Sequence, residues 1–112
     1  MRDYKVYLDD IYEAAKKIEK YVNDLTYAQF QQNELVLDAV IRNLEIIGEA
    51  SKNVPQNIKT QFSDIEWGKL SGLRNILIHE YFGVDSEILW DIVSNKIPKL
   101  KKEIFKVLRK GK

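Results

Sequence analysis

The chain has 112 residues, 45% of them hydrophobic and 11% aromatic, which is enough to bury one core and too little for two. Eighteen basic residues against 17 acidic ones give a net charge of +1, which excludes the strongly basic overall field of many nucleic-acid-binding domains. The lack of cysteine excludes disulfides, thiolate zinc sites and thiol nucleophiles. We therefore expect one domain, residues 1–112, in a reducing compartment, the cytoplasm.

Apolar runs in the chain are short. Segments such as ILI and LVLDAVI fall far below the roughly 20 residues that a membrane-spanning helix needs. The first ten residues, MRDYKVYLDD, contain no apolar region of the signal-peptide kind. We expect a soluble, cytoplasmic protein with no membrane partner.

The first predicted helix carries one apolar stripe with alternating spacings of four and three, which places its members on a single face. The stripe consists of Tyr4, Leu8, Ile11, Ala15, Ile18, Val22 and Leu25. Charged residues flank it on both sides. This pattern is typical of a helix that packs into a bundle.

The second predicted helix runs from about Asn33 to Lys52 and repeats the pattern with Leu37, Val40, Ile41, Leu44 and Ile47. A charged stripe lines its other face, formed by Asp38, Arg42, Glu45 and Glu49. Such a stripe is usually a solvated face. The alternative is that it faces a partner subunit or a cleft.

Two shorter signals divide the middle of the chain. Pro55 ends the second helix, and PQNIKTQF predicts a short helix with the proline in its first turn. Ser63 and Glu66 have the spacing of a capping box, which predicts that the next helix begins there. We expect that helix to end at Gly83.

The last part of the chain is again helical in pattern. Asp85 or Ser86 can cap the segment SEILWDIVSNKI, and Pro98 either kinks that helix or starts a new one. The final 17 residues, KIPKLKKEIFKVLRKGK, hold eight basic residues and one glutamate, a pattern typical of a solvated helix end, with an RNA contact as the alternative. The whole chain predicts an all-α bundle of four main helices plus a short one.

The stretch LRNILIHEYFG contains the only histidine, His79. Asn75 lies one helical turn before it, whereas Arg74 lies about 140° around the helix axis from it. In one straight helix Arg74 and His79 do not converge on a single atom. Convergence requires that the helix distort or end near His79, or that a second subunit bring an equivalent helix alongside, which indicates a dimer.

These residue types suit phosphodiester chemistry. Imidazole exchanges protons near neutral pH, and guanidinium is a permanent cation whose fork matches phosphate oxygens. In RNA they can assist attack of a 2′-OH on the adjacent phosphate. A lone histidine without cysteine, Glu-x-x-His or His-Glu-x-x-His disfavours a zinc or di-iron site, and no glycine-rich nucleotide loop is present. Spacing alone still favours a packed histidine over a catalytic one.

The stretch GLRNILIHEYFGVD resembles the Arg-x-x-x-x-His-x-Tyr signature of the HepT-like toxins in the HEPN superfamily of ribonucleases, met here by Arg74, His79 and Tyr81. The likeness covers nearly the whole chain. Further blocks similar to the family's, in the same order, are RDYKVYLDDIYEAAKKIEKYV, AVIRNLEIIGEASKNVP, the tryptophan of IEWGKLSGLRN, and ILWDIVSNKIPKL.

The resemblance implies a HEPN-type bundle that dimerises through its motif helices and acts as a metal-independent endoribonuclease toxin of a type VII toxin-antitoxin system. His79 would transfer protons, Arg74 would bind and stabilise the scissile phosphate, and Asn75 would support them. A nucleotidyltransferase antitoxin would adenylylate Tyr81. No cofactor is implied in this chain, since the ATP and its metal would belong to the partner.

Two other functions stay open. One is a non-catalytic HEPN module that holds a nucleotidyltransferase, and the other is a dimerisation scaffold in which His79 is buried. Trp67 and Trp90 are expected as core or interface anchors in preference to base-stacking platforms.

Overall fold

The structure, a computed structural model, describes residues 3–79 and 86–110; at residues 74–76, 78, 79 and 110 it describes the backbone alone. Every regular element in these ranges is helical. The elements are α1 (Tyr4–Val22), α2 (Tyr27–Gln32), α3 (Glu34–Lys52), α4 (Gln56–Gln61), α5 (Trp67–His79), α6 (Ser86–Asp91), a π-helical turn η1 (Ile92–Lys96) and α7 (Ile97–Lys110). The all-α prediction is confirmed. None of the described helices is long and apolar enough to cross a membrane.

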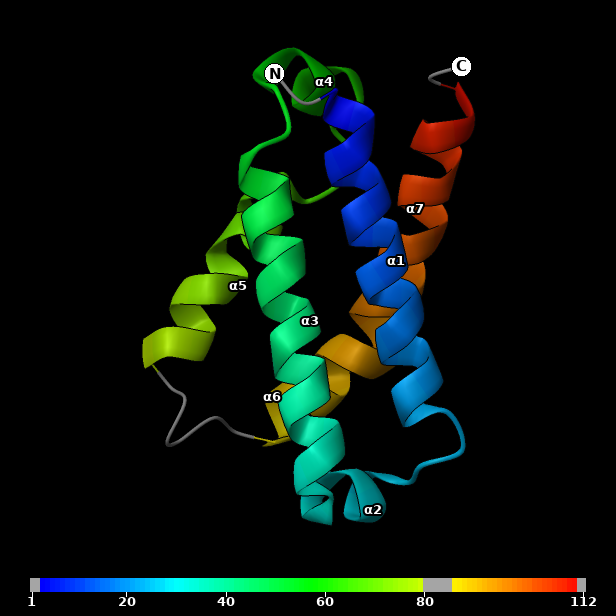
Figure 1. The fold of residues 1–112 in the computed structure, drawn as a ribbon, viewed down its shortest axis with the longest axis vertical. Coiled ribbons are helices and arrows are strands. Elements are labelled where there is room, and N and C mark those ends of the chain that lie inside the picture. Colours follow the sequence, from blue (N-terminus) through cyan, green and yellow to red (C-terminus); the bar gives the residue numbers. More distant parts are fainter. Residues whose placement is uncertain (1–2, 80–85, 111–112) are drawn as a thin grey trace.

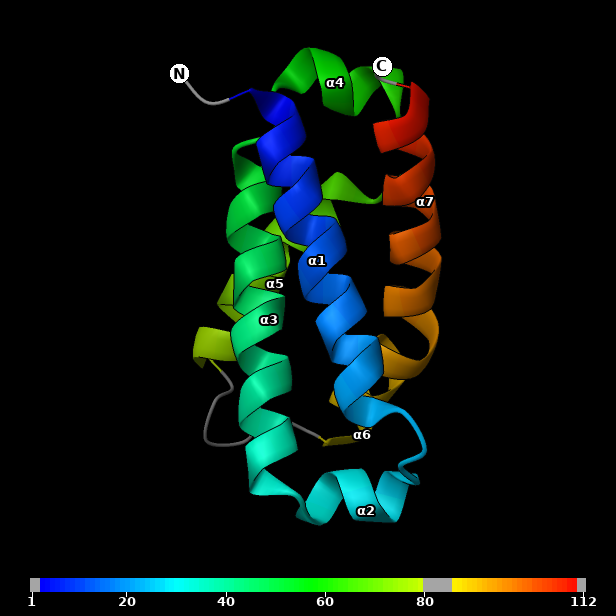
Figure 2. The same ribbon diagram turned by 45° about the vertical axis from the view of Figure 1, so that its right-hand side comes forward.

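The main helices run alternately up and down the bundle, with α2 across one end and α4 across the other (Figures 1 and 2). Extensive packing joins α1 to α3, α3 to α5 and α1 to α7. The four long segments therefore follow the spatial order α7, α1, α3, α5. The side between α5 and α7 holds a groove, which is described below.

The core is built from the stripes that the sequence predicts. Leu8, Ile11, Ala15 and Ile18 of α1 are fully buried, and so are Val40, Leu44 and Ile47 of α3. Burying one such aliphatic side chain stabilises the fold by about 1.5–3 kcal/mol. The opposite face of α3, including Asp38, Arg42 and Glu45, is exposed. In the single chain this charged stripe is therefore solvated.

A second short helix, α2, adds to the predicted set. The Thr26 hydroxyl accepts the Gln29 N–H at 3.2 Å, and the Gln29 side chain accepts the Thr26 N–H at 2.9 Å, so the two residues form a capping box. Phe30 is fully buried and lies against Trp90, with ring centroids 5.0 Å apart. The cap and the buried Phe30 help to hold a six-residue helix that is too short to show a periodic pattern.

The predicted capping box at Ser63 and Glu66 is wrong. Ser63 lies in a turn after α4, and α5 begins only at Trp67. The Trp67 indole N–H donates to the carbonyl of Phe62 at 3.1 Å, and Ile65 is buried although it is not helical. Burial of Ile65 and Trp67 fixes this turn. The burial stabilises the fold by more than the roughly 1 kcal/mol that a helix cap contributes. Trp67 is thus a core anchor.

The sequence predicts that Pro98 either kinks the helix or starts a new one, and the structure shows the kink. The chain is helical from Ser86 to Lys110, and the π-helical turn η1 stands just before the proline. Ile97 donates its N–H to Ile92, five residues back. A proline lacks an N–H and its ring crowds the carbonyl four residues earlier, so the wider turn relieves the clash. The chain bends between α6 and α7 (Figure 1). The predicted helix end at Gly83 and the Asp85 cap lie outside the described residues.

Candidate active site on α5

Helix α5 carries three of the four predicted site residues. The backbones of Arg74, Asn75 and His79 lie in its second half. Their side chains are not described, and Tyr81 lies outside the described residues. The helical setting of Arg74, Asn75 and His79 is confirmed, whereas the roles of all four residues stay predictions.

The rotation of α5 is fixed by two buried leucines. Leu73 and Leu77 are one turn apart and only 8% and 2% exposed, so they mark the side of α5 that faces the core. At 100° per residue, the position of Arg74 lies about 80° to one side of this direction and that of His79 about 140° to the other. Asn75 stands on the outward side. The motif positions therefore surround the part of α5 that points away from its own core.

The charged face of α3 offers a shallow depression near the middle of that helix. Arg42, Glu45, Ile46 and Glu49 line it around a volume of about 380 Å³. Arg42, Glu45 and Glu49 are exposed and Ile46 is half-buried. Helix α3 packs directly against α5, the helix through which we expect the chain to dimerise. The alternative that the charged face of α3 meets a partner subunit therefore stays open.

A deeper groove of about 410 Å³ lies between α5 and α7. Its floor is apolar, formed by Leu70, Leu73, Ile92, Ile97 and Leu100. Its border carries Lys69 from α5, Lys96 from η1 and Lys99 from α7. Sequence patterns did not reveal this feature, because its three lysines come from three separate elements.

Glu66 reports the positive potential at this groove. Its carboxylate lies 2.7 Å from the Lys69 ammonium. The hydrogen bond and charge of Lys69 lower the pKa of Glu66 from its ordinary value, and the charges of Lys96 and Lys99 add to the effect. All three lysines therefore stabilise the ionised carboxylate of Glu66, and Lys69 has the largest effect.

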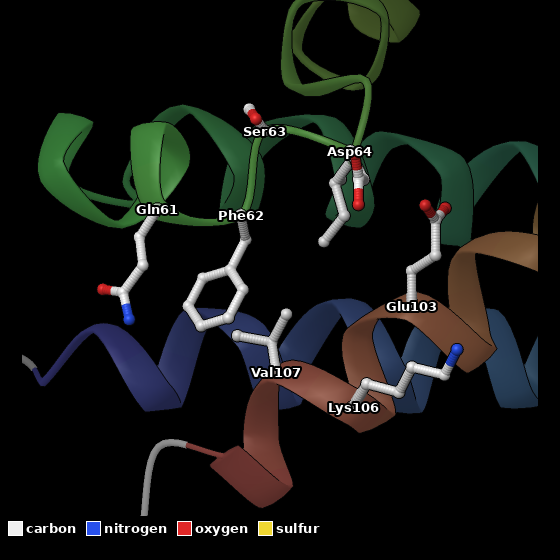
Figure 3. Close-up of a pocket in the computed structure, with 8 residues that line it drawn as sticks. Gln61, Phe62, Ser63, Asp64, Glu103, Lys106 and Val107 are labelled. Atoms are coloured by element: carbon white, nitrogen blue, oxygen red, sulfur yellow. The ribbon is translucent and has the colours of Figure 1, made fainter.

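A third cavity, of about 460 Å³, lies near the start of α5, between the turn that precedes this helix and α7. In Figure 3 the ring of Phe62 and the side chain of Val107 approach each other across it. Asp64, Glu103 and Lys106 supply two carboxylates and one ammonium. This lining does not favour an anion such as phosphate. Among the described residues, no cluster of three or more histidine, aspartate or glutamate side chains is arranged to hold a metal.

Residues 11–107 match the model of the family described as Ribonuclease HepT-like. The chain belongs to the HepT-like ribonuclease family. A relative from Thermococcus cleftensis, named "Probable ribonuclease HepT", is 45% identical over 97% of this chain and 98% of its own length. A "Putative RNase" of Methanocaldococcus jannaschii is 46% identical over 92% of this chain and 94% of its own. Another protein of that name, from Caldanaerobacter subterraneus subsp. tengcongensis, is 35% identical over the full length of both. No solved structure gives a significant match.

Membership in the HepT-like ribonuclease family confirms the resemblance on which the sequence analysis relied. It identifies the chain as a ribonuclease by family. The match begins in α1 and ends in α7, so it includes both halves of α5 and the groove beside it.

Proposed function

We propose that this chain is a metal-independent endoribonuclease toxin whose active site is built on Arg74 and His79. The observation that carries the proposal is its membership in a ribonuclease family, combined with the position of both residues in the second half of α5, on either side of the direction that points away from the core. An arginine and a histidine supply the two groups that cleavage by the RNA's own 2′-OH requires.

The reaction needs one proton removed and one proton supplied. A base takes the proton of the 2′-OH, and the oxygen attacks the adjacent phosphorus while the bond to the 5′-oxygen breaks. The leaving oxygen takes up a proton, so the products are a 2′,3′-cyclic phosphate and a 5′-OH. In this scheme His79 transfers the protons, Arg74 stabilises the charge on the phosphorane, and Asn75 orients one of them.

A homodimer would complete this site. The helix positions of Arg74 and His79 are separated by about 140° around the axis of α5, which keeps them from meeting on one atom in a straight helix. Pairing of two α5 helices would place the arginine of one subunit near the histidine of the other. The outward position of Asn75 supports this arrangement, because it leaves the motif face free of the subunit's own core.

The proposed control of the toxin acts at Tyr81. A nucleotidyltransferase antitoxin of a type VII system would transfer AMP from ATP to the phenol, and the ATP and its metal would belong to that partner. Because Tyr81 is two residues from His79, the phosphate of the added AMP would compete with RNA for Arg74. The proposal thus includes an RNA substrate, a nucleotidyltransferase antitoxin as partner and a location in the cytoplasm.

The chemistry is tested with a substrate that lacks one 2′-OH. Once a cleaved position is mapped in an RNA oligonucleotide, a second oligonucleotide with a 2′-deoxy sugar at that position should resist cleavage there. The RNA products should end in a 2′,3′-cyclic phosphate and a 5′-OH. Cleavage at the deoxy position, or products with a 5′-phosphate, would show that water is the nucleophile and would refute the mechanism.

A further inference from the structure

The groove between α5 and α7 has the two surfaces that a single-stranded nucleotide needs. Its apolar floor, which includes Leu70, Leu73 and Leu100, can contact a base, and ammonium groups stand at its border. Its volume of about 410 Å³ lies in the usual range of small-ligand pockets. Single-stranded RNA is bound by this combination of base contacts and charge.

The charge at the border favours phosphate. Lys96 and Lys99 are exposed, and Lys69 keeps 75% of its side chain in solvent while it pairs with Glu66. Glu66 and Glu103 offset two of the three positive charges around the groove. The groove therefore keeps a net charge of +1, since three lysines face two glutamates.

The groove lies beside the first half of α5, and the motif positions follow on the second half of the same helix. Lys69, Gly72 and His79 follow spacings of three and seven, which places them on one flank of the helix within about 80°. The helix rises about 10 Å from Gly72 to His79, roughly the length of three nucleotides in a stacked strand. An RNA chain cut at His79 continues past the scissile phosphate, and the groove lies where the neighbouring nucleotides pass. The lysines alone would also suit an acidic protein segment. An RNA substrate, in contrast, has to extend from the motif along the neighbouring surface, which is where the groove lies.

The geometry points to an RNA-binding subsite in this groove, in which Lys69, Lys96 and Lys99 hold the backbone of single-stranded RNA beside the cleavage site and the apolar floor receives a base. The inference rests on the proposed function, since it takes RNA as the substrate. In this inference, three lysines outside the motif position the RNA.

The test measures the affinity of the purified chain for a 2′-O-methyl oligonucleotide, which cannot supply the attacking hydroxyl. The variant Lys69→Gln/Lys96→Gln/Lys99→Gln should bind roughly tenfold or more weakly, and the slope of log K against log salt should fall in magnitude by about 2, since each phosphate contact on a single strand contributes about 0.7. The matched control is Lys16→Gln/Lys17→Gln/Lys20→Gln on α1. These three lysines are exposed, and α1 packs against α3 and α7. The control should leave both quantities near the wild-type values.

Gly72 provides an independent test of the floor. A Cβ at this position meets no atom within 4 Å, so a side chain can be added without a clash at its base. Gly72→Trp should fill the groove and weaken binding several-fold, whereas Gly72→Ala should bind as the wild type does. Circular dichroism of both variants verifies that the fold is kept.

The experiments distinguish a failure of the RNA-binding subsite from a failure of the proposed ribonuclease function. Equal affinity in the groove variant and the α1 control, with RNA cleavage by the wild type intact, overturns the subsite and leaves the proposed ribonuclease standing. A change of oligomeric state in Gly72→Trp, measured by ultracentrifugation, overturns it in favour of a second copy in the groove. Absence of any cleavage by the wild type counts against the proposed function itself.

Discussion

The Tyr27 hydroxyl and the Ser86 hydroxyl lie 2.8 Å apart, although the two residues are separated by 59 positions in the chain. Their hydrogen bond ties α2 to the first residue of α6. Tyr27 also packs on Trp90, with ring centroids 6.0 Å apart. These contacts hold α6 against α2 at one end of the bundle.

This hydrogen bond predicts a measurable coupling. Tyr27→Phe removes the hydroxyl and keeps the ring, so the free energy of unfolding should fall by about 0.5–1.5 kcal/mol. Ser86→Ala should have a similar effect, and the double variant should cost less than the sum of the two. Urea denaturation measures all four proteins. Strict additivity would show that the two hydroxyls do not interact.

Phe30 is the buried anchor of α2, and its loss should be costly. Phe30→Ala opens a cavity beside Trp90, so we expect the free energy of unfolding to fall by about 3–5 kcal/mol. Phe105 is the matched control, because 45% of it is exposed. Its replacement by alanine should cost clearly less in the same denaturation experiment. Equal losses at the two positions would contradict the assigned packing of α2.

The pKa of Glu66 should depend on Lys69. Its folded-state pKa lies below the ordinary value of 4.5, so the ionised carboxylate contributes stability that is present above pH 4.5 and is lost as the pH falls through the lowered pKa. Lys69→Gln should move the pKa of Glu66 back toward 4.5, as followed by NMR titration. The pair is largely exposed, so added salt should also weaken the shift. A Glu66 titration that is identical in the variant would refute the pairing.

Tyr81 should be the residue that takes up AMP. With a cognate nucleotidyltransferase, ATP and Mg²⁺, the wild-type chain should gain the mass of one AMP group and lose ribonuclease activity. Tyr81→Phe should keep the activity and gain no mass, because phenylalanine has no acceptor oxygen. Tyr21→Phe is a control, since Tyr21 is a partly exposed tyrosine on α1. Modification that persists in Tyr81→Phe would assign the acceptor to another residue.

The long helices were predictable because their apolar stripes are long enough to show a period. The stripe of α1 contains its fully buried residues Leu8, Ile11, Ala15 and Ile18. Helix α2 escaped prediction because six residues show no period, and its signal was the pair Thr26 and Gln29, which has capping-box spacing. The same spacing at Ser63 was misleading, because burial of Ile65 and Trp67 placed a turn there instead.

The motif was predictable from sequence because Arg74, His79 and Tyr81 lie within eight consecutive residues. The groove was not, because Lys69, Lys96 and Lys99 come together only when α5, η1 and α7 are assembled. Periodicity describes one helix at a time. A surface formed by three elements depends on their packing, which no single stretch of sequence reports.

The most direct test of the central claim is RNA cleavage by the purified, unmodified chain in EDTA, compared with His79→Ala, Arg74→Ala and the control Arg109→Ala, which removes an exposed arginine at the far end of α7. Circular dichroism and ultracentrifugation establish that all four proteins are folded and share one oligomeric state. The account predicts that the wild type and Arg109→Ala cut RNA in the presence of the chelator, while the two motif variants lose at least about a hundredfold in rate. A folded, dimeric wild type that cuts no RNA, or motif variants that cut as fast as the control, would contradict it.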